Sequence, residues 1–172
     1  MCERPWETRA FRHLLPLSIM SRSEVSTHRI ADVQEMTALG EKIAHQCRAG
    51  DLILLNGPLG AGKTVLVQGI GAALGFSDVT SPTFVISRSH NGALALIHVD
   101  VYRLLESGNA ASYFDDLDLD SARESAVTVI EWGGAESARL SDERLEIDID
   151  RTEDERVVTV RAIGARWAGF TL

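Results

Sequence analysis

Apolar residues recur along the chain in two periods from about residue 26 onward, one typical of helices and one typical of strands. Residues 33–47 carry apolar side chains at helical spacing, and Asp32 and Glu35 have the spacing of a capping box at its start. Residues 65–74 predict a second helix, which stops at Gly75. Short apolar or alternating runs predict strands at 26–30, 52–55, 84–88, 93–99, 126–130, 144–150 and 156–162.

These elements follow one another in an order that predicts a single α/β domain, over residues 25–165. Two hairpins are expected within it, one at Asn91–Gly92 and one that joins the last two runs and faces solvent. Residues 1–24 lack such a pattern, and we expect an extension that is either disordered or upstream of a true start at Met20. Residues 166–172 are expected to form a short tail.

The composition narrows the class of protein. The 172 residues carry a formal net charge of −8, so the chain has no general attraction to nucleic acid or to anionic lipid. Its two cysteines, Cys2 and Cys47, are too few for a disulfide framework, which favours a reducing, cytoplasmic setting. No apolar run approaches the roughly 20 residues that a membrane-spanning helix needs.

The clearest motif is GPLGAGKT, Gly57 to Thr64, which matches the pattern G-x-x-x-x-G-K-[ST] of a phosphate-binding loop. A buried strand is predicted before it and a helix after it, as this chemistry requires. Glycines let successive backbone N–H groups point at phosphate oxygens, while Lys63 supplies a charge and Thr64 a hydroxyl for Mg²⁺. The expected nucleotide-binding residues of this segment are Gly57, Pro58, Leu59, Gly60, Ala61, Gly62, Lys63, Thr64 and Val65.

Two predicted strands end in a carboxylate, Asp100 and Glu131. In open α/β sheets, ligands bind at the carboxyl ends of the strands, so both acids are candidates for the metal or the attacking water. The alternative is that each is the first solvated residue after its strand.

Three further features lie near these positions in the sequence. The hydroxyls of Thr80, Ser81 and Thr83 are those of a segment that senses a γ-phosphate or its metal, or of an ordinary polar turn. Trp132 either packs or shields the site from water. His98 is expected to be a hydrogen-bonded structural histidine rather than a base.

The motifs also restrict the class of nucleotide enzyme. The chain has no N-K-x-D guanine signature, because Lys42 and Lys63 are its only lysines, so adenine is favoured. A small-molecule kinase remains an alternative, with Arg139 and Arg144 as a candidate lid. A nucleotide-sensing module without useful turnover is a third.

Several motifs occur together in one order: Leu39–Gly40, GPLGAGKT, VTSPTF (79–84), HVDVYRL (98–104) and VIEW (129–132). In this combination, over about residues 26–150, the chain resembles the TsaE (YjeE) family. The resemblance implies a P-loop NTPase-like three-layer α/β fold with a mixed parallel and antiparallel sheet. It also implies an ATPase that binds ATP or ADP with Mg²⁺ and acts with TsaB and TsaD. These partners perform the threonylcarbamoylation of tRNA adenosine 37, so contact with tRNA is only indirect.

The resemblance also implies residue roles. Lys63, Asp100 and Glu131 are the expected catalytic residues, with Glu131 polarising the attacking water. Thr64, Asp100 and Glu131 are the expected metal ligands, and Thr83 and Trp132 complete the expected nucleotide site.

The sequence departs from the family pattern at two points. DLDLD (116–120) has no glycine where family members often have one, and Gly133–Gly134 follow the VIEW motif. No arginine is evident near the phosphate loop. We therefore expect weak activity from the isolated protein and completion of the site by partners.

Overall fold

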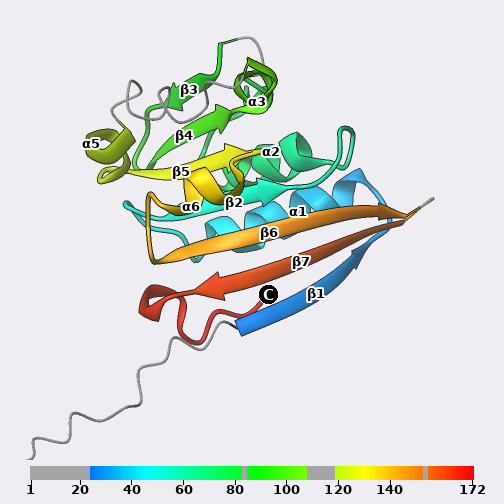
Figure 1. The fold of residues 1–172 in the computed structure, drawn as a ribbon. Helices are drawn as coiled ribbons and strands as arrows, with labels where there is room; N and C mark the ends of the chain where they lie inside the picture. Colours follow the sequence, from blue (N-terminus) through cyan, green and yellow to red (C-terminus); the bar gives the residue numbers. More distant parts are fainter. Residues whose placement is uncertain (1–23, 83–84, 108–118, 153–154) are drawn as a thin grey trace, which may run out of the picture.

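The computed structural model describes residues 24–82, 85–107, 119–152 and 155–172, which form a seven-stranded mixed sheet with helices on both faces (Figure 1). The strand order is β1-β7-β6-β2-β5-β4-β3. Strands β6, β2, β5 and β4 run parallel to their neighbours in that group, while β3, β7 and β1 pair antiparallel. The elements are β1 (Glu24–Ile30), α1 (Val33–Ala44), β2 (Leu52–Asn56), α2 (Lys63–Ala73), β3 (Ser87–His90), β4 (Ala95–Asp100), α3 (Tyr102–Ser107), α5 (Leu119–Arg123), β5 (Ala126–Glu131), α6 (Gly134–Ala138), β6 (Arg144–Thr152), β7 (Glu155–Ile163) and the 3₁₀ turn η1 (Ala165–Trp167).

Three layers result from two apolar clusters, one on each face of the sheet. Side chains of α1 and α2 pack against alternate positions of the strands, such as Ile53 and Val129. The positions between them, such as Leu54 and Ile130, pack against α3, α5 and α6. The predicted fold class is confirmed, and within the described residues no helix is long and apolar enough to cross a bilayer.

Helix α1 begins where the capping pattern predicts. Asp32 is its N-cap and accepts a hydrogen bond from the backbone N–H of Glu35, whose own carboxylate accepts one from the N–H of Ala31. The helix packs closely on α2, because a Cβ at Gly40 or Gly69 would overlap a backbone oxygen of the other helix. This close approach fixes the axis of α2, whose N-terminus carries the phosphate loop.

The predicted strand at 84–88 is only partly correct. Strand β3 begins at Ser87, and the N–H groups of Val85 and Ile86 both donate to the carbonyl of Pro82 in a turn. Ile86 has φ +68, outside the strand region, although its apolar side chain favours a strand. Residues 83 and 84 lie outside the described residues, as do residues 1–23 and 115–118.

The C-terminal runs form the expected hairpin, β6–β7, but it lies inside the sheet, with β2 on one side and β1 on the other. Residues 166–172, expected as a tail, contribute to the core. Trp167 is 2% exposed and meets the ring of Phe170 edge to face. Arg166 donates two hydrogen bonds to the buried carboxylate of Asp51 and one to the carbonyl of Gln46.

We predict that Trp167→Ala lowers the free energy of unfolding by about 3–5 kcal/mol, because a buried ring leaves a cavity behind. Urea unfolding followed by circular dichroism measures this loss. The control is Arg139→Ala, whose ion pair with Glu136 is largely exposed and is expected to contribute less than about 1 kcal/mol. Equal stability of Trp167→Ala and the wild type would make residues 166–172 a dispensable tail.

Candidate functional site

The phosphate loop, Gly57–Thr64, joins the end of the buried strand β2 to α2, which begins at Lys63. Its three glycines, at positions 57, 60 and 62, all have positive φ, which other residues rarely adopt. Gly57 has φ +141 and a Cβ there would overlap the carbonyl oxygen of Ile149, while Gly62 has φ +110 as the N-cap of α2. The loop therefore depends on glycine at both ends of its turn.

Lys63 lies within this loop and is 5% exposed. Its Nζ donates to the carbonyls of Gly57 (2.8 Å) and Pro58 (3.1 Å). Burial lowers the pKa of Lys63 from its ordinary value, and the nearby carboxylates of Glu131 and Asp100 act in the opposite direction. A buried cation beside two acids is therefore built into the loop.

The two strand-end acids lie side by side, because Asp100 and Glu131 are register partners of the parallel strands β4 and β5. Both are almost fully buried. Oε1 of Glu131 accepts a hydrogen bond from the hydroxyl of Thr64 at 3.1 Å. Asp100 accepts from the hydroxyl of Ser81 at 3.1 Å and from the backbone N–H of Tyr102 at 3.0 Å. Neither acid is the solvated end of a strand.

A cavity of about 300 Å³ opens over the loop and the two acids. Most of the predicted site residues line it, but Gly57, Pro58 and Ala61 are not among its lining residues. Thr83 lies outside the described residues. The lining residues are Leu59, Gly60, Gly62, Lys63, Thr64, Val65, Ser81, Asp100, Tyr102, Glu131, Trp132 and Arg156.

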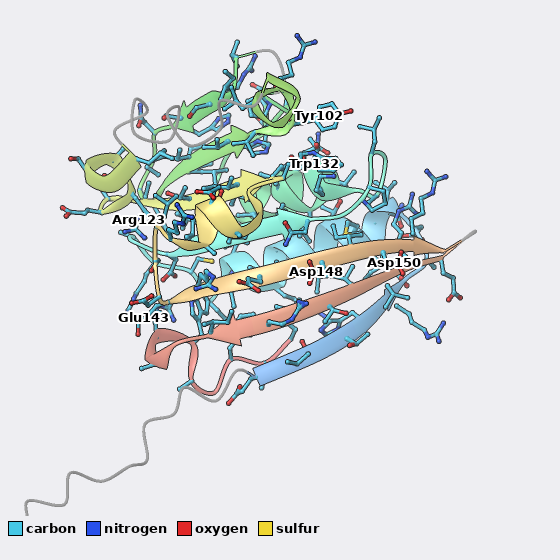
Figure 2. The ribbon with its side chains drawn as sticks, in the orientation of Figure 1. Tyr102, Arg123, Trp132, Glu143, Asp148 and Asp150 are labelled. Atoms are coloured by element: carbon cyan, nitrogen blue, oxygen red, sulfur yellow. The ribbon has the colours of Figure 1, made fainter. Side chains whose placement is uncertain are left out.

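Trp132 covers one side of this cavity. Its ring lies over Lys63, with Nζ 3.7 Å from the ring centroid, and packs against Tyr102 at 5.0 Å between centroids. Figure 2 shows Tyr102 and Trp132 together beyond the ends of β4 and β5. Trp132 has φ +66, a backbone conformation that costs a non-glycine residue about 1–2 kcal/mol. The indole therefore packs against its neighbours and also lines the cavity, while its role in shielding the site from water stays a prediction.

An arginine does reach the phosphate loop, contrary to the expectation from the sequence. Arg156, at the start of β7, lines the cavity and its Nε donates to the carbonyl of Ala61 at 3.0 Å. The strand pattern contained the signal: Arg156 has the same phase as the buried Val158, Val160 and Ala162, so it lies on the helix-covered face of the sheet. A charged residue on the core face of a strand points to a partner or a site.

The candidate lid arginines do not line the cavity. Arg139 pairs with Glu136, and Arg144 pairs with Glu146. In the hydroxyl-rich segment, Ser81 contacts Asp100 as described above, whereas Thr80 accepts from Arg88. Sequence reasoning named Ser81 among three hydroxyls and did not single out Tyr102, although it lies in the HVDVYRL motif.

His98 is fully buried on β4 and hydrogen-bonded, as the sequence predicts, and its partner is one of the two strand-end acids. Its Nε2 lies 2.9 Å from Oε1 of Glu131, the oxygen that also accepts from Thr64. The histidine therefore contacts a candidate catalytic acid directly.

The comparisons with known proteins agree with one another. The family model described as "Threonylcarbamoyl adenosine biosynthesis protein TsaE" matches residues 30–159. Proteins named tRNA threonylcarbamoyladenosine biosynthesis protein TsaE from Streptomyces coelicolor and Bacillus subtilis are 46% and 37% identical to this chain. Those alignments cover 77% and 81% of this chain and 94% and 87% of the relatives. The crystal structure of Bacillus subtilis YdiB matches with a TM-score of 0.71 at 32% identity, covering 85% of this chain and 90% of that one.

The strand–loop–helix unit, with two acids at the ends of neighbouring parallel strands, defines a P-loop NTPase-like α/β protein. Within that class the matches are specific and span most of the chain. The protein belongs to the TsaE family of tRNA threonylcarbamoyladenosine biosynthesis proteins.

Proposed function

We propose that this protein binds ATP with Mg²⁺ in the cavity over the phosphate loop and hydrolyses it. The observation that carries the proposal is the meeting of Lys63, Thr64, Glu131 and Asp100 at one buried edge of the sheet. ATP turnover serves the threonylcarbamoylation of tRNA adenosine 37 by homologues of TsaB and TsaD, and the protein does not itself perform that transfer. Family membership supports this part of the proposal.

The donor set fits Mg²⁺. Thr64 offers a hydroxyl and Asp100 and Glu131 offer carboxylates, which are the hard oxygen ligands that this ion prefers. Bound there, Mg²⁺ would neutralise charge on the phosphates. Lys63 contributes a fixed positive charge, and the backbone N–H groups at the start of α2 point toward the same space.

Glu131 is the proposed group that orients the attacking water. Its Oε1 accepts two hydrogen bonds from within the protein, and the carboxylate faces the cavity. Trp132, packed on Tyr102 at the cavity wall, restricts the entry of further water.

The net charge of −8 supports an indirect role at tRNA, because such a chain repels the phosphate backbone on average. A small-molecule kinase is a weaker candidate, because the arginines considered for its lid are paired elsewhere.

We predict that the protein hydrolyses ATP slowly alone and faster with the TsaB and TsaD homologues of its own organism. Glu131→Ala is expected to lower the stimulated rate about 100-fold or more, because the group that orients the water is lost. Phosphate release measures hydrolysis, and nucleoside mass spectrometry of tRNA measures the modification, which is expected to disappear in the variant.

Two results would contradict this function. Full modification of tRNA with Glu131→Ala would mean that the protein does not need to hydrolyse ATP for its role. Phosphoryl transfer to a metabolite hydroxyl, without stimulation by the partners, would favour the kinase. Rapid ATP hydrolysis by the isolated protein would contradict only the expected dependence on partners and would leave the ATPase activity itself supported.

We further predict that Arg156 contributes to the binding of nucleotide phosphates, because its guanidinium lies at Ala61 beside the loop, on the side of β7 rather than of β5. Arg156→Gln is expected to weaken ATP and ADP equally, by about 10-fold, as expected for one charge-assisted hydrogen bond. Isothermal titration measures both affinities, and kcat is expected to change little.

The matched control is Arg29→Gln on the neighbouring strand. Arg29 is exposed, pairs with Glu155 and lies opposite Val157, one position along from Arg156. Its substitution is expected to leave both affinities unchanged. An unchanged affinity for ADP in Arg156→Gln would limit this arginine to holding the loop through Ala61.

A further inference from the structure

His98 is a buried polar residue that the proposed function leaves without a role. It lies on β4 two positions before Asp100, so both side chains are on the α2 side of the sheet. The ring is 0% exposed, and its Nε2 lies 2.9 Å from Oε1 of Glu131. A fully buried imidazole in contact with a functional carboxylate has a defined orientation.

The direction of this hydrogen bond follows from the surroundings. An ionised carboxylate only accepts, so Nε2 must carry the hydrogen and donate it. The other nitrogen, Nδ1, is buried and has no hydrogen-bond partner among the described residues. A hydrogen on Nδ1 would be a buried donor without a partner, whereas a bare Nδ1 costs less, so the neutral tautomer with hydrogen on Nε2 fits the site.

One oxygen of Glu131 thus has two donors from two elements. Oε1 accepts from His98 on β4 and from the hydroxyl of Thr64 on α2. Within the described residues no hydrogen bond is made by Oε2, and Glu131 lines the cavity. The hydroxyl of Thr64 is a proposed metal ligand. When this hydroxyl binds the metal, the hydrogen bond from His98 is the remaining fixed contact of the carboxylate.

We propose that His98 is a positioning residue, which holds Oε1 of Glu131 through Nε2–H so that Oε2 is directed at the attacking water. The inference rests on the proposed function, since it assigns a role through Glu131. The histidine acts as the outer partner of a functional carboxylate, a kind of contact whose loss typically costs about 10–100-fold in activity.

Two variants of similar size separate positioning from packing. His98→Gln places an amide N–H near the position of Nε2, whereas His98→Asn places one only near that of Nδ1. In the complex with the TsaB and TsaD homologues, we expect His98→Asn to lower kcat about 10–100-fold with little change in KM for ATP. We expect His98→Gln to recover most of that loss. His90→Gln on β3, outside the cavity lining, is the control and is expected to keep the wild-type kcat.

The melting temperatures of the two variants complete this comparison. Equal melting temperatures with unequal kcat values support positioning. Equal kcat values for Gln and Asn, whether high or low, overturn it, because a packing role does not depend on where the N–H lies.

A second readout needs neither nucleotide nor partners. Long-range ¹H–¹⁵N correlation spectra of the isolated protein, assigned with His98→Gln, identify the nitrogen that carries the hydrogen. We expect the Nε2–H tautomer and a changed Nε2 resonance in Glu131→Ala; hydrogen on Nδ1 overturns the proposal. If the wild-type complex does not hydrolyse ATP, the proposed function fails, and this spectrum still decides whether His98 donates to Glu131.

Discussion

The carboxylate of Glu131 joins three elements of the fold through one oxygen. It ends β5 and accepts from Thr64 at the start of α2 and from His98 on β4. Burying an unpaired carboxylate costs several kcal/mol, so its donors and the nearby charge of Lys63 are a condition for this arrangement. Because β4, β5 and β2 run parallel, their ends meet at one edge, and the loop, the lysine and both acids are positioned together.

The two halves of the sheet contribute differently to the site. The central strands β2, β5 and β4 are buried on both faces, and their ends carry the phosphate loop and the two acids. In the other half, no described helix lies over the outer face of β6 and β7 (Figure 1), where Asp148 and Asp150 project in Figure 2. On that face Asp148 pairs with Arg161, whereas Arg156 points the opposite way and reaches the loop. Side chains alternate between the two faces along β7, so Arg161 forms an ion pair on the outer face while Arg156 reaches the cavity.

The sequence predicted the parts of the site whose chemistry is local. The phosphate loop, the strand endings at Asp100 and Glu131 and the cap of α1 depend on residues within a few positions of each other. The hairpin that carries Arg156 was predicted, but this arginine reaches Ala61, 95 positions away in the chain, because β6 pairs with β2. No short window of the sequence contains that pairing, and only the phase of Arg156 on its strand marks it. The sequence wrongly predicts a strand at Ile86. The hydrogen bonds to the carbonyl of Pro82 form a turn there and override the strand preference of the isoleucine side chain. The core position of Trp167 likewise depends on the fold as a whole, since Arg166 beside it is held by Asp51.

The contacts of Lys63 bear on how tightly the proposed nucleotide can bind. Its ammonium already has two carbonyl acceptors, from Gly57 and Pro58, and the face of Trp132 above it. A bound phosphate must replace some of these contacts. The binding free energy gained at Lys63 is therefore the difference between its contacts with phosphate and its contacts within the loop, and is smaller than that of a new ion pair. The loop and the indole therefore hold the lysine in a state that a phosphate can displace, which is compatible with the proposed binding and release of nucleotide.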